Sequence, residues 1–176
     1  PMLILGIDPG TATTGYGVVR KSKNKFELLG FGLIETDKNG SPGKRLAEIY
    51  KQMNLVLSTF KPDIVAIEKL FFARNAKTAM RVGQAHGVLL LSAAKYKAEV
   101  FEYAPMSVKK VLTGNGHADK KDVQKSVRRV LGAKVRSKKH QKTHFDNSAD
   151  ALAVALCHAL QANKNRRSQL DSAVRI

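Results

Sequence analysis

The sequence predicts an α/β fold in which a five-stranded mixed sheet is flanked by helices. An apolar run over residues 3–7 ends at the turn residues Asp8, Pro9 and Gly10, which is typical of a buried strand. Two more strand-like segments follow, with a short polar loop between them. Helix and strand patterns then alternate along the rest of the chain, and this alternation indicates an α/β architecture.

The expected strands and helices have ordinary lengths. The polar loop 21–25 separates the second and third strands and predicts a hairpin. Residues 64–67 are all apolar, which predicts a strand that is buried on both faces. The last helix is nearly all Ala, Leu and Val, so most of its circumference should be covered. We expect strands over 3–7, 15–20, 26–35, 64–67 and 98–101, and helices over 42–60, 75–95, 105–112, 119–131 and 148–160.

The length of the chain suits one domain. A chain of 176 residues can bury a full hydrophobic core, and no internal repeat is visible. We expect residues 1–162 to form this domain and the basic tail over 163–176 to be disordered.

Three small residues lie four apart on the helix expected over 75–95, namely Ala79, Gly83 and Gly87. This spacing puts them on one face, where another backbone can approach closely. Two explanations fit equally well at this stage: the face packs on the protein's own sheet, or it contacts a second copy of the chain.

Positive charge is the strongest feature of the composition. Lys and Arg number 31 against 14 Asp and Glu, which gives a net charge of +17. Such a domain attracts polyanions, and nucleic acid is the commonest of these, although a merely solvated surface can also be this basic. Between Lys120 and Lys142 there are ten basic residues and one acid, so affinity for DNA should fall steeply with salt.

Other features of the composition concern location. No stretch of about 20 apolar residues is present, so we expect no membrane-spanning helix. Cys157 is the single cysteine, which rules out an internal disulfide and suits a reducing cytoplasm. The apolar run before Asp8 lacks a basic leader and a small-residue cleavage site, so we interpret it as a strand and not as a signal peptide.

The few acidic residues are placed where chemistry can occur. Asp8 ends the first strand and Glu68 ends the fourth, so both carboxylates reach one edge of the sheet if these strands are parallel neighbours. Asp150 lies in the first turn of the last helix, with Asp146 and Asn147 just before it. Carboxylates that converge repel one another unless they bind a cation such as Mg²⁺. The pattern therefore favours a metal site for phosphodiester hydrolysis.

Each of these residues also has a purely structural explanation. The sequence Asp8-Pro9-Gly10 is ordinary turn chemistry. Asn147 and Asp150 are three apart at the start of a helix, as in a capping box. Glu68 could pair with a lysine.

Taken together, the motifs resemble those of the RuvC family of Holliday-junction resolvases, and they keep that family's order over nearly all of residues 2–160. No single motif decides the resemblance, but the set is highly specific. The matching segments are Leu5-Gly6-Ile7-Asp8-Pro9-Gly10, Gly15-Tyr16-Gly17, Ala66-Ile67-Glu68-Lys69-Leu70-Phe71-Phe72, Asn75-Ala76, Val82-Gly83-Gln84-Ala85, Gly87, Val100-Phe101-Glu102-Tyr103-Ala104-Pro105 and Ala149-Asp150-Ala151-Leu152-Ala153.

The resemblance implies a ribonuclease-H-like fold and a homodimer that nicks two symmetric strands of a four-way DNA junction. It implies two Mg²⁺ ions per subunit, for which Mn²⁺ substitutes, and the branch-migration proteins RuvA and RuvB as partners. A closed two-fold dimer matches the symmetry of such a junction.

The resemblance also assigns residues. Asp8, Glu68 and Asp150 match metal-binding carboxylates of the family. Phe71 matches the aromatic residue that probes bases near the junction centre, and Lys109 and Lys120 match basic residues near the scissile phosphate. The DNA-binding set that we expect is Phe71, Phe72, Arg74, Asn75, Lys77, Lys109, Lys120 and Lys121.

One position departs from the family pattern. The residue three before the last acid is usually Asp, or His in some members, whereas here it is Asn147. Either Asn147 is a substitution made to trap an uncut junction, or Asp146 shifts in to serve as the ligand. We favour the first, because one residue turns a helical side chain by about 100°. The hypothesis is that this chain binds junctions well and cleaves them poorly.

Three alternative functions differ in their partners. An ATP-binding domain of the actin and sugar-kinase type also opens with an Asp-x-Gly-Thr loop, as in Asp8 to Thr11, but such proteins need two lobes. A ribonuclease-H-like nuclease could act on RNA hybrids instead of junctions. The third alternative is a non-catalytic junction-binding protein, and Asn147 favours it.

Overall fold

The computed structural model describes residues 1–70, 76–132 and 148–162. Every expected strand and helix is present, with ends that differ by a few residues. The last helix covers 148–162. The other elements are β1 (Met2–Asp8), β2 (Thr13–Ser22), β3 (Lys25–Glu35), α1 (Pro42–Phe60), β4 (Ile64–Glu68), α2 (Ala76–Tyr96), β5 (Glu99–Tyr103), α3 (Pro105–Thr113) and α4 (Lys120–Leu131).

The five strands form one mixed sheet in the order β3-β2-β1-β4-β5. β2 pairs antiparallel with β1 and with β3, whereas β4 lies parallel to both β1 and β5. The expected loop 21–25 is wrong in extent, because Lys21 and Ser22 still pair with Phe26 and Lys25. The turn is shorter since continued pairing satisfies the backbone groups that a longer loop would leave to water.

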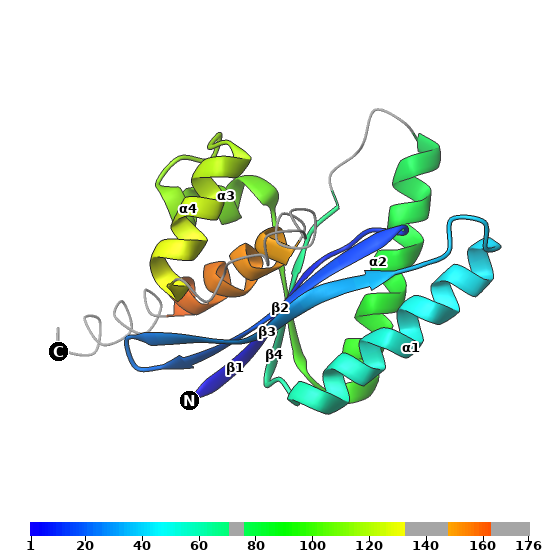
Figure 1. Cartoon of the computed structure of the whole chain (residues 1–176), viewed down its shortest axis with the longest axis horizontal. Helices are drawn as coiled ribbons and strands as arrows, with labels where there is room; N and C mark the ends of the chain where they lie inside the picture. Colours follow the sequence, from blue (N-terminus) through cyan, green and yellow to red (C-terminus); the bar gives the residue numbers. More distant parts are fainter. Residues whose placement is uncertain (71–75, 133–147, 163–176) are drawn as a thin grey trace, which may run out of the picture.

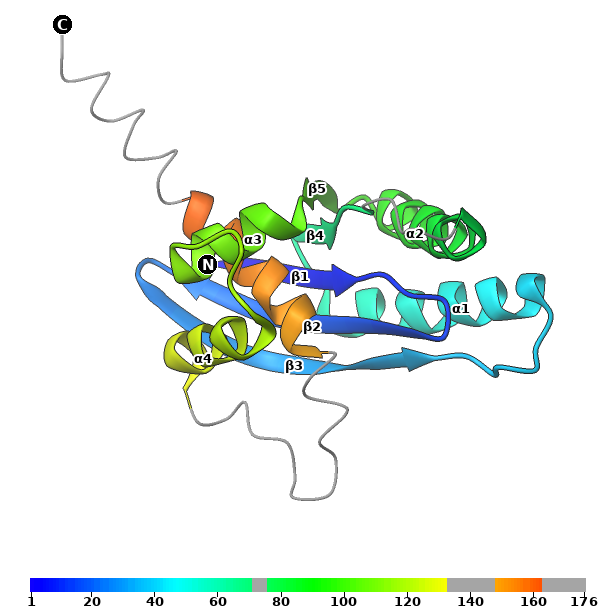
Figure 2. The same cartoon turned by 90° about the horizontal axis from the view of Figure 1, so that it is seen from above.

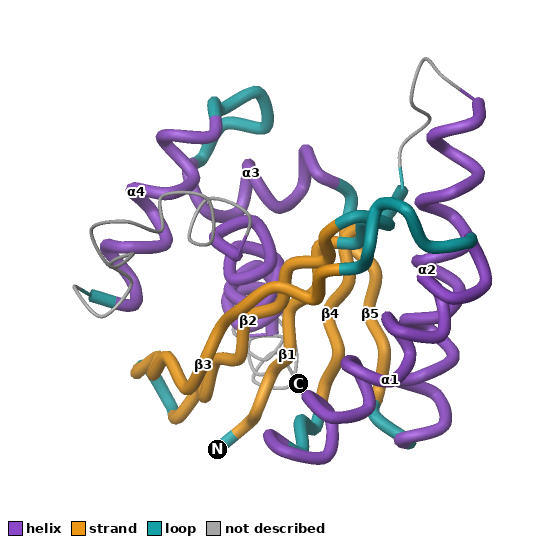
Figure 3. The backbone as a smooth tube through the Cα atoms, turned by 45° about the vertical axis from the view of Figure 1, so that its right-hand side comes forward, coloured by secondary structure: helices purple, strands orange, loops and turns teal. Residues whose placement is uncertain are grey.

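Helices cover both faces of the sheet, as Figures 1 and 2 show. α1 and α2 lie on one face, and α3, α4 and the last helix lie on the other. In Figure 3 the sheet runs between these two groups of helices. Each group closes its own apolar core, one around Leu5, Ile7 and Leu57 and the other around Ile4, Val127 and Leu156.

The last helix crosses the centre of the sheet in very close contact. A Cβ atom on Gly6 of β1 would collide with the carbonyl oxygen of Ala151, and one on Gly17 of β2 would collide with Leu152. Residues 148–159 are buried except for Asp150, so the expected burial of this helix is confirmed. Its far end is fixed by the buried Lys21, whose Nζ donates to the Ala159 carbonyl at 2.6 Å.

Among the helices of the described ranges, none combines the length and apolarity needed to cross a membrane.

The close contact at Gly6 makes a specific prediction. Gly6→Ala should lower the free energy of unfolding by about 1–3 kcal/mol, because the helix backbone must move to admit a methyl group. Gly43→Ala in α1 is the matched control: its Cβ meets nothing within 4 Å, so stability should stay equal or rise by up to about 1 kcal/mol. Urea denaturation measures both. Equal effects of the two substitutions would show that the contact does not constrain the fold.

Candidate active site

Asp8 and Glu68 lie beside each other at one edge of the sheet. β1 and β4 are parallel neighbours whose last paired residues are Ile7 and Ile67, so each acid follows that pair by one residue. The expectation that these two strands are parallel neighbours is therefore confirmed.

The alternation of side chains along the strands decides which face the acids occupy. Ile7 and Ile67 belong to the core under α1 and α2. Their successors Asp8 and Glu68 therefore point to the opposite face, where the last helix, α3 and α4 lie.

Hydrogen bonds within the loop after Asp8 fix its backbone. The Thr14 hydroxyl donates to the Gly10 carbonyl at 2.7 Å and accepts from the Gly10 amide at 3.3 Å. Thr14 is fully buried and Gly10 is half-buried, so water has limited access to this pair of hydrogen bonds. The turn predicted at Asp8-Pro9-Gly10 lies later in the chain, because Asp8 still belongs to β1 and the bend falls at Thr11 and Ala12. The hydrogen bonds between Gly10 and Thr14 hold the start of this loop in place.

Asp150 reaches the same region from the last helix. The Ser148 hydroxyl donates to the Gly32 carbonyl of β3 at 3.2 Å and anchors the first turn of that helix. The residue after Asp150, Ala151, lies against Gly6, two residues before Asp8 on the same face of β1. The close contact of helix and strand therefore brings the third acid to the first two.

Two lysines complete the surroundings of these acids. Lys120 Nζ lies 3.0 Å from Asp150 Oδ2, and the Asp150 side chain is 32% exposed. Lys120 is the first residue of α4, which begins there because the Asp119 carboxylate accepts from the Asp122 amide at 2.8 Å and caps the helix. An open cavity of about 290 Å³ brings together Glu68, Lys109, Lys120 and Asp150.

The acids at this edge hold their protons unusually tightly. Burial raises the pKa of Asp8 to about 6, with a further rise from the Asp150 charge and an opposing effect of Lys120. Burial also raises the pKa of Glu68 to about 7, followed by the charges of Asp8 and Asp150, while Lys109 opposes the rise. The three carboxylates therefore influence one another, and removal from water is the main cause of the shifts.

The donor chemistry of this site fits a hard divalent cation. Carboxylate oxygens are the preferred ligands of Mg²⁺, and a bound cation would favour the charged carboxylates that burial and mutual repulsion disfavour. Asp150 is paired with Lys120, and within residues 1–70, 76–132 and 148–162 no group of three His, Cys, Asp or Glu side chains is close enough to hold a metal as placed. Asp146 and Asn147 lie outside the described residues.

A family model described as "Crossover junction endodeoxyribonuclease RuvC" matches residues 4–158. This chain belongs to the RuvC family. The enzymes of this family are metal-dependent endodeoxyribonucleases, and the chain is a nuclease of that kind.

Relatives from several bacteria share much of the sequence. The RuvC of Natranaerobius thermophilus is 46% identical over 158 residues, which cover 90% of this chain and 94% of the relative. The RuvC of Thermosipho melanesiensis is 46% identical over 160 residues, which cover 91% of this chain and 98% of the relative.

Solved structures share the fold. Thermus thermophilus RuvC in complex with Holliday junction substrate superposes with a TM-score of 0.82 at 37% identity, covering 94% of this chain and 97% of that one. A second structure of Thermus thermophilus RuvC gives a TM-score of 0.80. The yeast mitochondrial resolvase Ydc2, at 17% identity, has the same fold with a TM-score of 0.69. The ribonuclease-H-like fold inferred from the sequence is confirmed.

The other residues assigned from the sequence fall into two groups. Lys77 and Lys121 are exposed, the first near the start of α2 and the second near the start of α4. Four members of the expected DNA-binding set lie outside the described residues: Phe71, Phe72, Arg74 and Asn75. The tail over 163–176 lies outside them as well.

The raised pKa values of the two acids predict how the stability of this RuvC chain depends on pH. Without metal, the folded state binds protons on Asp8 and Glu68 more tightly than the unfolded chain, so their stabilising contribution is complete below about pH 4. It is lost as the pH rises through about 6 and 7. In chelator, the free energy of unfolding should fall by on the order of 1–3 kcal/mol from pH 5 to pH 8.

The double variant Asp8→Asn/Glu68→Gln isolates this contribution, because it removes both titrations and keeps the side-chain shapes. Urea denaturation at several pH values should show a much smaller decline for the variant than for the unsubstituted chain. Parallel profiles for the two proteins would contradict the prediction.

Proposed function

We propose that this chain resolves Holliday junctions by nicking two symmetric DNA strands in a reaction that needs two Mg²⁺ ions per subunit, with Mn²⁺ as a substitute. The observation that carries the proposal is the buried pair Asp8 and Glu68 at one edge of the sheet, within electrostatic reach of Asp150 and two lysines, in a chain with a net charge of +17. Family membership supports the junction as substrate, since the related Thermus thermophilus RuvC is described in complex with one.

Each side chain of the site has a role in this proposal. Asp8, Glu68 and Asp150 hold the metal ions, together with Asn147 or Asp146. Bound Mg²⁺ would supply an activated water and stabilise the leaving oxygen. Lys109 and Lys120 lie in the same cavity as Glu68 and Asp150, so they can hold the scissile phosphate there.

The ion pair between Lys120 and Asp150 fits this division of roles. In it, the lysine supplies the positive charge that Asp150 would otherwise obtain from a cation. Lys120 is half exposed, so its ammonium group can turn from the carboxylate to a phosphate when metal binds. One side chain would thus serve in both states of the site.

The remaining DNA contacts are proposed from position and resemblance. Lys77 and Lys121 are exposed and can contact phosphates of the arms. Phe71 is proposed to probe bases near the junction centre, and Phe72, Arg74 and Asn75 are proposed to contact the DNA. Discrimination against plain duplex should come mainly from junction shape and deformability.

Replacing Glu68 tests the proposed reaction. Glu68→Gln should lower the rate of junction cleavage by at least about 100-fold, because it removes a charged ligand and leaves its shape. Junction binding should persist in a gel-shift assay, since the acid does not contact the arms. The matched control is Glu27→Gln, which removes an exposed acid paired with Arg20. Cleavage of a duplex or an RNA hybrid as fast as of a junction would contradict the proposed substrate.

Replacing Asn147 tests the hypothesis of impaired cleavage. Asn147→Asp should raise the cleavage rate by about tenfold or more, because a carboxylate neutralises cation charge and an amide does not. Asp146→Asn in the otherwise unchanged chain tests the alternative that Asp146 is the metal ligand. If that alternative is right, this substitution abolishes cleavage. No gain from Asn147→Asp refutes the hypothesis. Binding without any nick in Mg²⁺ or Mn²⁺, for the unsubstituted chain and for the Asn147→Asp variant alike, supports the non-catalytic junction-binding alternative.

The homodimer is proposed to form through one face of α2. A Cβ atom on Gly87 would meet nothing within 4 Å, so this part of the face does not pack against the described residues of the chain. Met80 and Leu91 lie on the same side of the helix and are 69% and 54% exposed. Light scattering should give twice the 19.3 kDa mass of one chain.

Gly87→Glu should shift the mass measured by light scattering to that of a monomer, and Gly43→Glu on α1 is the control. A monomeric unsubstituted chain would refute the homodimer.

The remaining partners are proposed from family resemblance, and the location is proposed from the single cysteine, Cys157. We infer that the branch-migration proteins RuvA and RuvB act with this chain, in the cytoplasm. Co-purification of junction-bound RuvA and RuvB with the tagged chain tests this partnership, and its absence in the presence of junction DNA would refute it.

A further inference from the structure

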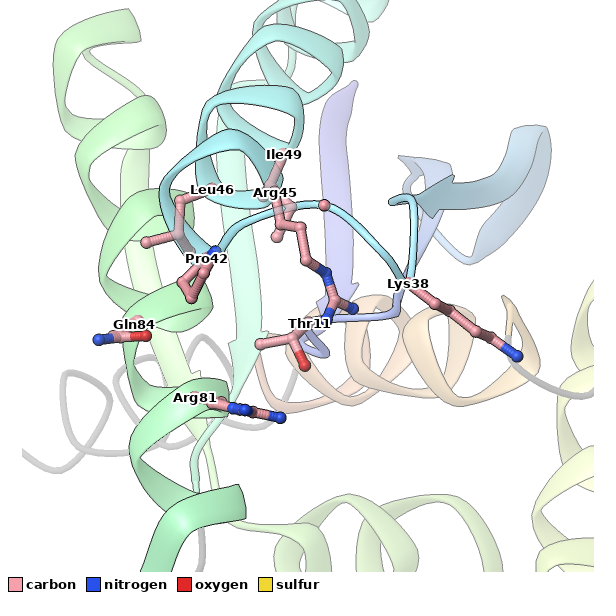
Figure 4. A pocket seen from close by; sticks show the side chains of 9 residues that line it. Thr11, Lys38, Pro42, Arg45, Leu46, Ile49, Arg81 and Gln84 are labelled. Carbon is pink, nitrogen blue, oxygen red and sulfur yellow. The ribbon is translucent and has the colours of Figure 1, made fainter.

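A second basic cavity lies on the other face of the sheet, near the same edge as the acids. Its walls come from the loop after β1, the loop before α1, the start of α1 and the middle of α2. It measures about 120 Å³. Figure 4 shows the residues that matter here, which are Thr11, Lys38, Arg45, Arg81 and Gln84.

Arg45 is held in position by its neighbours. Its Nε donates to the Thr36 hydroxyl at 2.9 Å, and that hydroxyl donates to the Thr11 carbonyl at 2.6 Å. The Thr36 amide also donates to the Ala12 carbonyl at 3.1 Å, so the loop after β1 is tied to the end of β3. In Figure 4 the guanidinium group of Arg45 points toward Thr11. A guanidinium group fixed through Nε is preorganised to bind an anion through its two terminal nitrogens.

The lining of this cavity carries three cations and no acid. Lys38, Arg45 and Arg81 contribute the positive charges, and none of them takes part in the ion pairs found in the described part of the chain. Thr11 and Gln84 add neutral hydrogen-bonding groups. The two guanidinium groups at this cavity repel one another, and an anion bound between them would relieve that repulsion. The Lys38 side chain extends away from them in Figure 4 and adds positive charge at the rim.

We propose that this cavity binds one phosphate of the DNA backbone, on the strand that runs past the acids at the sheet edge. The inference rests on the proposed function, and it adds a contact on the face of the sheet opposite to the acids. The anion is a phosphodiester and not a whole nucleotide, because pockets for drug-sized ligands measure roughly 300–1,000 Å³ and this one about 120 Å³.

The position of the cavity along the chain supports a role next to cleavage. Thr11 follows Asp8 by three residues, so their Cα atoms are at most about 11 Å apart. One short loop therefore carries an acid of the cutting site on one side and the phosphate cavity on the other. A DNA strand that is bound both at the acids and at this cavity has a fixed register on the protein. Phosphate contacts usually have this positioning role.

The test compares two double variants in junction binding. Lys38→Gln/Arg81→Gln removes two cations of the cavity and leaves Arg45 with its hydrogen bond to Thr36. Lys25→Gln/Lys51→Gln removes the same charge at two exposed positions. Lys25 is the first residue of β3, far from Asp8 along the sheet, and Lys51 lies in α1. Dissociation constants for a four-way junction are measured from 50 to 200 mM salt, and melting temperatures check the folding of each protein.

The cavity variant should bind more weakly by about threefold to tenfold at low salt, and the slope of log affinity against log salt should fall by about 0.9. The control variant should keep the slope of the unsubstituted chain. Equal slopes for both variants would overturn the proposal. Failure of the unsubstituted chain to bind a junction would instead contradict the proposed function, so the two failures are distinguishable.

Neutral phosphates locate the contact. Methylphosphonate groups are placed one at a time along the strands of the junction, and affinity is measured for the unsubstituted chain and the cavity variant. One position near the cut should weaken binding of the unsubstituted chain and leave the variant unaffected. If inorganic phosphate binds the cavity in calorimetry but no methylphosphonate position distinguishes the proteins, the site serves a free anion and the proposal is wrong.

Discussion

The close contact between the last helix and the first two strands is the constraint on which the site depends. Gly6 and Gly17 lack side chains where Ala151 and Leu152 lie against the sheet, and larger residues there would collide with the helix. The contact sets the height of the helix above β1, and thereby the place of Asp150 relative to Asp8. A carboxylate moved by even a small distance cannot share a cation with its neighbours, because Mg²⁺ demands near-ideal geometry. The two glycines therefore influence the site indirectly, because they allow the packing that positions Asp150.

The raised pKa values at the site arise because two buried acids lie side by side in an otherwise basic protein. Burial is the first cause of the raised pKa values of Asp8 and Glu68, and mutual repulsion adds to it. Lys109 and Lys120 oppose these shifts without abolishing them. A site that is costly to ionise when empty gains most from a divalent cation, since the metal replaces protons on the carboxylates. The surrounding lysines then become available to the phosphates of the substrate.

Much of this arrangement could be predicted because it follows from local periodicity. The apolar runs before Asp8 and Glu68 indicated buried strands, and parallel pairing then placed both acids at one edge. The ion pair of Lys120 with Asp150 and the hydrogen bond of Arg45 with Thr36 could not be predicted in this way. Both join elements whose relative position is set by packing over many residues, and a sequence pattern of period two or 3.6 carries no information about it. Arg45 was missed for this reason, since on the sequence it is one more basic residue in an amphipathic helix.

The loop between β1 and β2 links the two faces of the sheet physically. Its Asp8 end faces the last helix, while its Thr11 end is tied through Thr36 to Arg45 near α2. A DNA strand that contacts both ends must pass over the sheet edge, from the acids on one face to the cations on the other. Such an arrangement would fix the position of the strand without reading a base, as phosphate contacts position a duplex but carry no sequence information. Any preference for sequence at the cut must then come from side chains that reach the bases or from the ease with which the junction deforms.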